Sequence, residues 1–157
     1  MIVYIPRHIG GAGKWIYEGY FNAWKSEGYD AVYYDNISEI DTSSPYMLMA
    51  TEGGINTSPE FLLFNVLAKA VKVFMYVQPH SFPQPWGLHP NFVTTASPGF
   101  VNLVNGFDNI KLWSFSETDK VSYWDKWKDV AYIPLAFDNI GYDFAPKDKF
   151  KYDVCYV

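Results

Sequence analysis

Residues 2–14 read IVYIPRHIGGAGK, an apolar run followed by a glycine-rich turn, and this stretch decides the fold class. The run from Ile2 to Ile5 has the length of a strand, and Pro6 ends it. Three glycines then allow a tight turn into a helix, which the apolar spacing predicts from about Lys14 to Glu27. A buried strand, a glycine turn and an amphipathic helix in this order indicate an α/β fold.

The same alternation continues along the rest of the chain. Further apolar runs of strand length occupy residues 31–34, 46–50, 73–77, 110–115 and 130–135, and helical patterns cover 58–70, 97–105 and 116–128. Strands that are apolar throughout and separated by helices are typical of a parallel sheet covered on both faces. The sequence therefore predicts a Rossmann-like, doubly wound and mainly parallel sheet with helices on both faces. Residues 35–45 leave little room for a crossover helix, and residues 81–96 predict a long loop.

Composition and charge exclude several classes of function. The chain has 157 residues, of which 18% are charged and 49% hydrophobic, as expected for a folded domain rather than a disordered one. Its net charge is −5 and it has no basic run, so we expect no nucleic-acid partner. No apolar window approaches the roughly 18 residues of a membrane helix, and no signal peptide is recognisable. These features predict a cytoplasmic protein that does not span a membrane.

The cysteine and histidine content argues against a metal centre. Cys155 is the single cysteine, which excludes an internal disulfide and a cysteine-based zinc cluster. His80 and His89 lie nine residues apart, and no third ligand stands near them. We therefore expect no metal site and no bound cofactor.

Polar residues and glycines follow three of the predicted strands at the point where each strand ends. The first strand is followed by Arg7, His8, Gly10, Gly11 and Gly13, the third by Glu52, Gly53 and Gly54, and the fourth by His80. Ligands of an open parallel sheet bind beyond the carboxyl ends of its strands, and these ends share one edge. The sequence therefore predicts a ligand site that all three groups border.

The glycine turn has two interpretations. Glycines before a helix let a phosphate approach the backbone N–H groups at the helix start, but they are equally typical of a tight strand-to-helix turn. A phosphate-binding P-loop would need glycine at the position of His8 and serine or threonine at that of Trp15. A dinucleotide fingerprint would need a small residue in place of Ile16. The turn thus matches neither motif.

The side chains at this edge also leave alternatives open. His80 is a candidate proton-transfer or ligand-binding group, and Glu52 a candidate general base or acceptor for a hydroxyl. Arg7 and His8 are candidates for neutralising a diphosphate. Each of the four also fits an ordinary loop or turn position. The aromatic residues around Trp113 and Trp127 are better explained as core than as a platform for a sugar.

Three segments, in order along the chain, resemble the amino-terminal half of GT-B glycosyltransferases. They are the glycine turn at residues 10–13, Gln78-Pro79-His80 after the fourth strand, and the strand, proline and aspartate of residues 130–138. Residues 152–157 are similar to the first strand of the second domain of these enzymes. Among these enzymes, the chain resembles most the group 1 or the spore-protein-like (CgeB-type) members.

This resemblance implies an activity and an organisation. GT-B enzymes have two Rossmann-like domains; the amino-terminal one mainly binds the hydroxyl acceptor, the carboxyl-terminal one holds the nucleotide-sugar, and no metal is generally needed. Gly11 and Gly13 would approach the diphosphate, and His80 would contact the donor sugar or assist at the reacting centre. Residues 1–138 would form the acceptor-side domain, and residues 139–157 a linker and the first strand of a donor domain that is missing, so that the chain alone would be inactive. The alternative is a non-catalytic Rossmann-like module that binds a sugar or a nucleotide.

Overall fold

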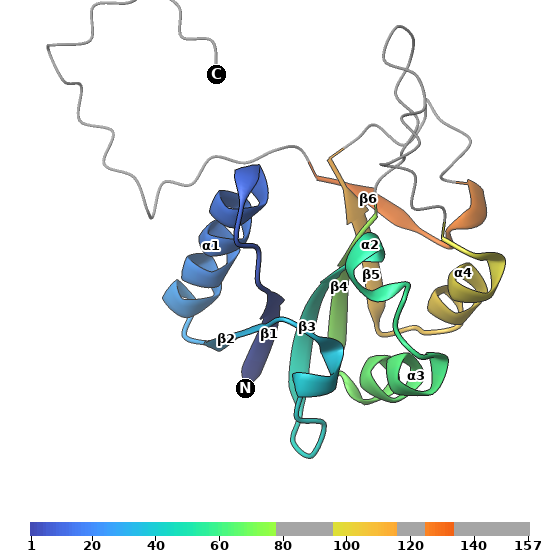
Figure 1. Cartoon of the computed structure of the whole chain (residues 1–157), viewed down its shortest axis with the longest axis horizontal. Helices are drawn as coiled ribbons and strands as arrows, with labels where there is room; N and C mark the ends of the chain where they lie inside the picture. The colour runs from blue at the N-terminus through green and yellow to red at the C-terminus, as the bar shows by residue number, and fades with distance from the viewer. Residues whose placement is uncertain (78–95, 116–124, 134–157) are drawn as a thin grey trace, which may run out of the picture.

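Six strands form a single sheet, and helices lie between them along the chain (Figure 1). The computed structural model describes residues 1–77, 96–115 and 125–133. The strands are β1 (Ile2–Pro6), β2 (Asp30–Tyr34), β3 (Tyr46–Thr51), β4 (Lys72–Tyr76), β5 (Ile110–Ser114) and β6 (Val130–Tyr132). The helices are α1 (Gly11–Ser26), α2 (Glu52–Ile55), α3 (Glu60–Lys69) and α4 (Pro98–Asn105), with a 3-10 turn, η1 (Ile37–Glu39).

All neighbouring strands in the sheet are parallel, in the order β2-β1-β3-β4-β5-β6. This confirms the predicted parallel α/β fold and gives it a Rossmann-like topology. The chain moves outward from β1 to β2 and then returns across β1 to β3. The order of the strands therefore reverses between β1 and β3, the kind of position where open α/β sheets bind ligands.

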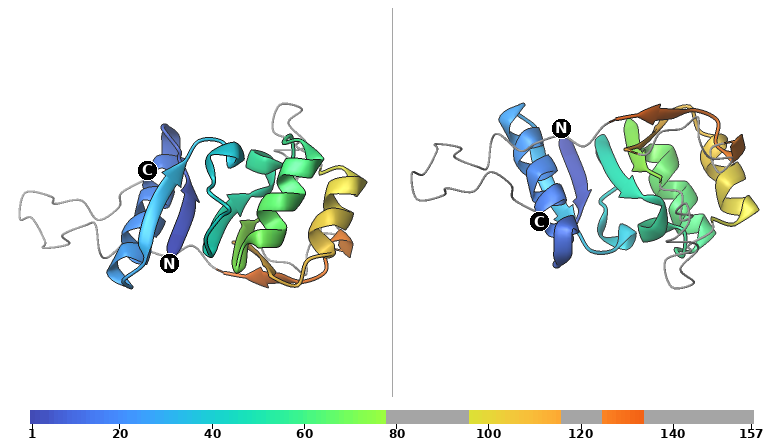
Figure 2. Two further views of the ribbon diagram at one scale, coloured as in Figure 1. Left: turned by 90° about the horizontal axis from the view of Figure 1, so that it is seen from below. Right: turned by 90° about the horizontal axis from the view of Figure 1, so that it is seen from above.

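Helices cover both faces of the sheet, as Figures 1 and 2 show. Because side chains of a strand alternate between faces, neighbouring residues enter different cores. Val3 and Met47 pack under α1 in one core. Tyr4 and Leu48 pack on the opposite face, in the core that also contains the buried side chains of α3 and α4.

Helix α1 differs from its prediction at its first residue. It begins at Gly11, three residues earlier than Lys14; Gly11 has a φ of +61°, which glycine adopts readily, and the chain continues from it directly into the helix. It ends at Ser26, one residue before the predicted Glu27, and Gly28 has a φ of +82° just beyond the last turn. The link between β2 and β3 contains only η1, in agreement with its short length.

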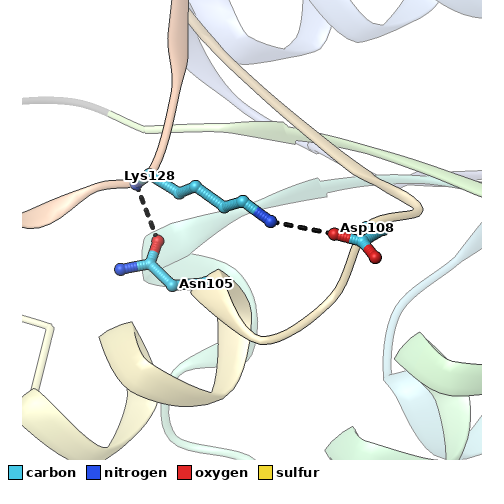
Figure 3. Close-up of polar contacts among 3 residues, drawn as sticks. All are labelled: Asn105, Asp108 and Lys128. Carbon is cyan, nitrogen blue, oxygen red and sulfur yellow. Dashed lines mark hydrogen bonds and ion pairs between the residues drawn. The ribbon is translucent and has the colours of Figure 1, made fainter.

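In addition to the pairing of β6 with β5, the residues before β6 are attached to α4 and the loop after it (Figure 3). The side-chain amide of Asn105 donates to the carbonyl of Lys126 (2.8 Å) and accepts from the backbone N–H of Lys128 (2.9 Å). The Lys128 ammonium also pairs with Asp108 at 2.8 Å, on the surface. These contacts fix the residues that lead into β6.

Several predictions concern residues outside the described ranges. They are the motif at residues 78–80, the loop before Ala96, the end of the 130–138 motif with the domain boundary near residue 138, and the strand at residues 152–157. The helix predicted at residues 116–128 is described only from residue 125 on, and residues 125–128 are not α-helical. Within the described ranges, no helix is long and apolar enough to cross a membrane.

Candidate functional site

The candidate site lies at the carboxyl edge of the sheet, where β1 and β3 separate. The two strands pair from Ile2 and Tyr46 to Tyr4 and Leu48. One residue further along β3, the carbonyl of Met49 accepts a hydrogen bond from the hydroxyl of Tyr34, at 3.0 Å. Tyr34 belongs to β2, on the other side of β1, so its side chain spans the end of β1 at the reversal point. Burial raises the pKa of Tyr34 well above its usual range, which keeps the hydroxyl a neutral donor.

Arg7 follows β1 at this edge and is held by three contacts. Its backbone N–H donates to the carbonyl of Tyr34 at 2.9 Å. Its guanidinium lies 3.3 Å from the carboxylate of Asp35 and 5.1 Å from the centre of the Tyr33 ring. Arg7 and Asp35 are both about half exposed. The positive charge of Arg7 is therefore available at the rim but is already shared with Asp35.

His8 is exposed, yet its ring has a defined place. The imidazole lies nearly parallel to the ring of Tyr17, with 4.4 Å between their centres and 13° between their planes. Tyr17 itself is only 7% exposed and belongs to the core under α1. A Cβ atom added at Gly13 would lie 2.9 Å from Nδ1 of His8. Position 13 is thus kept free of a side chain by the imidazole of His8.

The start of α1 has no side-chain cap. Gly10 stands at the N-cap position without a side chain, and no acidic residue follows in the first turn. A Cβ atom at Gly10 or Gly11 would meet nothing within 4 Å. First-turn N–H groups without such a partner favour a nearby anion, and Arg7 adds a positive charge at the same edge.

Glu52 lies at the same edge, at the first position of α2, and is only 2% exposed. The predicted turn after β3 is this short helix, which Thr51 caps by accepting from the N–H of Gly54 at 3.0 Å. One oxygen of the Glu52 carboxylate accepts from the N–H of Ala96, at 3.2 Å. Glu52 therefore anchors the residues that lead into α4.

Hydroxyl-bearing rings extend the site toward β4 and β5. Tyr20, one turn after Tyr17 on α1, makes an edge contact with Trp113 of β5, and Trp113 also contacts Tyr76 of β4. The hydroxyl of Tyr76 is buried without a hydrogen-bond partner among the described residues. Burial raises the pKa of Tyr76 above its usual range, and the nearby Tyr20 raises it further. The sequence analysis missed these tyrosines, although Tyr76 ends a strand at the predicted edge.

The structure brings most of the predicted residues to one edge but over different faces of the sheet. The starts of α1 and α2 both lie at the carboxyl edge (Figure 1). Tyr17, against which His8 stacks, belongs to the core under α1, whereas Ile55 and Ala96 beside Glu52 belong to the opposite core. Gly53 is exposed within α2. His80 lies outside the described residues.

Comparisons with known protein families, curated proteins and solved structures found no match for this chain. The described residues contain no group of three or more histidine, cysteine, aspartate or glutamate side chains that could hold a metal ion. The groups described at this edge are the uncapped start of α1, the guanidinium of Arg7, the imidazole of His8 and the hydroxyls of nearby tyrosines.

Proposed function

We propose that the chain is a glycosyltransferase-like domain that binds a nucleotide-sugar and a hydroxyl acceptor at the carboxyl edge of its sheet. Transfer of the sugar would take place together with a second, donor-binding domain, as the GT-B resemblance implies. The observation that carries this proposal is the placement of these groups at one edge of the sheet: Arg7, His8 and the uncapped start of α1 follow β1, and Glu52 follows β3 over the opposite face.

The chemistry of these groups suits the parts of such ligands. The start of α1 and Arg7 would attract the negatively charged diphosphate. Tyr20 is half-buried on α1, and its hydroxyl is protonated at neutral pH, as that of any tyrosine with a pKa of about 10 or above is. Neutral hydroxyls donate and accept hydrogen bonds, which suits a sugar better than an ionised group would. Stabilisation of the departing diphosphate by such groups would contribute to the rate of transfer.

One observation favours a second candidate, a non-catalytic module that binds a sugar or nucleotide. A general base needs to reach the proton that it removes. The buried carboxylate of Glu52 already accepts from the N–H of Ala96. If Glu52 serves this structural contact alone, the site binds its ligand without turnover.

Ligand binding tests the proposal first. The chain is titrated calorimetrically with a panel of nucleotide-sugars, free nucleoside diphosphates and free sugars. We expect binding that needs the diphosphate, and we expect Arg7→Ala to weaken it about tenfold through loss of a charge-assisted contact. Lys25→Ala, which removes a cation from the last turn of α1, is the matched control and should leave binding unchanged. If no compound in the panel binds, the proposal is wrong.

Turnover separates the two candidates. If the chain, alone or with a donor-binding domain added, transfers or hydrolyses the sugar of a bound nucleotide-sugar, it is an enzyme and not a non-catalytic module. Binding without turnover in either experiment would favour the module. Glu52→Gln keeps the acceptor oxygen for Ala96 and removes the carboxylate, so we expect it to abolish turnover only if Glu52 is the base.

A further inference from the structure

We infer that Tyr17 and Gly13 are positioning residues, which hold the imidazole of His8 in place for the ligand of the proposed site. This inference rests on the proposed function and adds to it a defined contact residue with its supports. Gly13 and Tyr17 stand four residues apart in α1, so they lie one above the other on the same side of the helix. The ring of His8 lies against both.

Each support restricts the imidazole in a different way. Tyr17 is buried and supplies a fixed face for the parallel stack at 4.4 Å. Gly13 leaves room for the Nδ1 edge of the ring, since a Cβ atom would lie only 2.9 Å from Nδ1 and 3.2 Å from Cγ. The Nε2 atom is on the opposite edge of the ring and is the nitrogen left to meet a ligand.

A restricted exposed side chain has a consequence for binding. An exposed side chain normally loses conformational freedom when a ligand immobilises it, and this loss weakens binding. His8 has already lost much of that freedom in the stack. A neutral imidazole offers a donor or an acceptor nitrogen to a sugar hydroxyl or a phosphate oxygen. The stack therefore prepares His8 for contact with either.

The position of the ring is tested without any ligand. We would record the carbon-bound imidazole protons by NMR and assign those of His8 by their loss in His8→Gln; the chain has two other histidines. In the folded chain we expect an upfield ring-current shift relative to the urea-unfolded chain. Tyr17→Phe keeps a ring and should keep the shift, whereas Tyr17→Leu should abolish it. Gly13→Ala should change it, because the added methyl displaces the imidazole.

Gly10→Ala is the matched control for Gly13→Ala. It adds the same methyl group three residues earlier, at a φ of −147°, where nothing lies within 4 Å. We expect Gly10→Ala to leave the His8 signals unchanged. Absence of the shift in the wild-type chain, or its survival in Tyr17→Leu and Gly13→Ala, would overturn the inference.

Calorimetric titrations with UDP-glucose test whether His8 and its two supporting residues contribute to the affinity for the ligand. We expect His8→Ala, Gly13→Ala and Tyr17→Leu each to weaken binding about tenfold, while Tyr17→Phe, which keeps the stacking ring, binds as the wild type. Because Gly13 acts through His8, adding Gly13→Ala to His8→Ala should cause no further loss. A purely structural role of Gly13 would weaken binding in both backgrounds.

The outcomes distinguish the inference from the proposed function. Binding by the wild-type chain that Gly13→Ala and Tyr17→Leu do not weaken contradicts the positioning role and leaves the proposed function intact. Failure of the wild-type chain to bind UDP-glucose or any other nucleotide-sugar of the panel contradicts the proposed function. In that case His8 also has no nucleotide-sugar to contact, and the inference fails together with the proposed function.

Discussion

At the scale of single residues, two predicted site glycines have neighbours that explain them. Gly13 faces the imidazole of His8, and Gly54 faces the hydroxyl of Thr51. In both cases the close neighbour is a side chain of the protein itself. A glycine in a loop that is expected to bind a ligand can therefore be needed because a side chain of the protein itself fills the position of its missing Cβ atom.

Gly54→Ala should destabilise the fold. An added Cβ atom would lie 2.6 Å from Oγ1 of Thr51, the atom that caps α2. Displacing a capping oxygen costs about 1 kcal/mol of unfolding free energy, and the better helix propensity of alanine offsets part of it. Urea denaturation measures the change. Thr51→Ser keeps the capping oxygen and should remain close to the wild type, and an unchanged or increased stability of Gly54→Ala would contradict the argument.

At the scale of elements, the side-chain amides of two asparagines connect helices to the segments that lead into neighbouring strands, and the hydrophobic pattern does not predict these connections. Asn109, in the turn before β5, donates to the carbonyls of Leu67 and Ala70 at the end of α3, at 2.8 and 2.7 Å. Asn105 joins α4 to the residues before β6 in a similar way. Helix ends expose carbonyls that need donors, and Asn109 supplies two donors to the end of α3 from a distant part of the chain.

Asn109→Leu should lower the unfolding free energy by about 1–3 kcal/mol, since two hydrogen bonds at the end of α3 are lost. Hydrogen exchange followed by mass spectrometry would show faster exchange in α3 than in α1. Asn109→Asp is the sharper variant, because it has nearly the same shape but presents a carboxylate to two carbonyl oxygens. We expect it to be at least as destabilising, and wild-type stability in Asn109→Asp would show that the amide donor is not needed.

At the scale of the whole molecule, buried tyrosines link the stability of the fold to alkaline pH. Burial raises the pKa of Tyr46 from 10.0 to about 12, with Tyr4 adding to the effect, and it raises the pKa values of Tyr17, Tyr34 and Tyr76 as well. A raised pKa in the folded state gives stability that is fully present below the pKa of the unfolded chain. That stability is lost as the pH rises toward the folded pKa.

Stability should therefore fall steeply above about pH 10, by about 1.4 kcal/mol per pH unit for each of these tyrosines. Tyrosinate absorbance and circular dichroism should change together in one cooperative step, because these tyrosines ionise when the chain unfolds. Tyr46→Phe should reduce the slope, although it loses the hydrogen bond to the carbonyl of Val66. Ionisation of all tyrosines near pH 10 in a chain that stays folded would contradict this account.

The sequence by itself determined the fold class and the edge of the sheet at which the candidate site residues lie. Apolar runs such as that of β1, followed by the glycine turn and α1, require buried parallel strands with helical crossovers, and the polar residues after these runs then share one edge. Local alternation is enough for this conclusion because it depends only on neighbours along the chain.

Only the tertiary structure decided which side chains meet at that edge. Three contacts each join residues from different parts of the chain. They are the hydrogen bond from Tyr34 to the carbonyl of Met49 across β1, the hydrogen bond that Glu52 accepts from Ala96, and the ring contact of Tyr20 with Trp113. Such contacts depend on strand order and on the packing of α1 against the sheet, which local alternation of apolar and polar residues does not fix. The physical reason is that a pattern specifies which face of an element is buried but not the element against which it is buried.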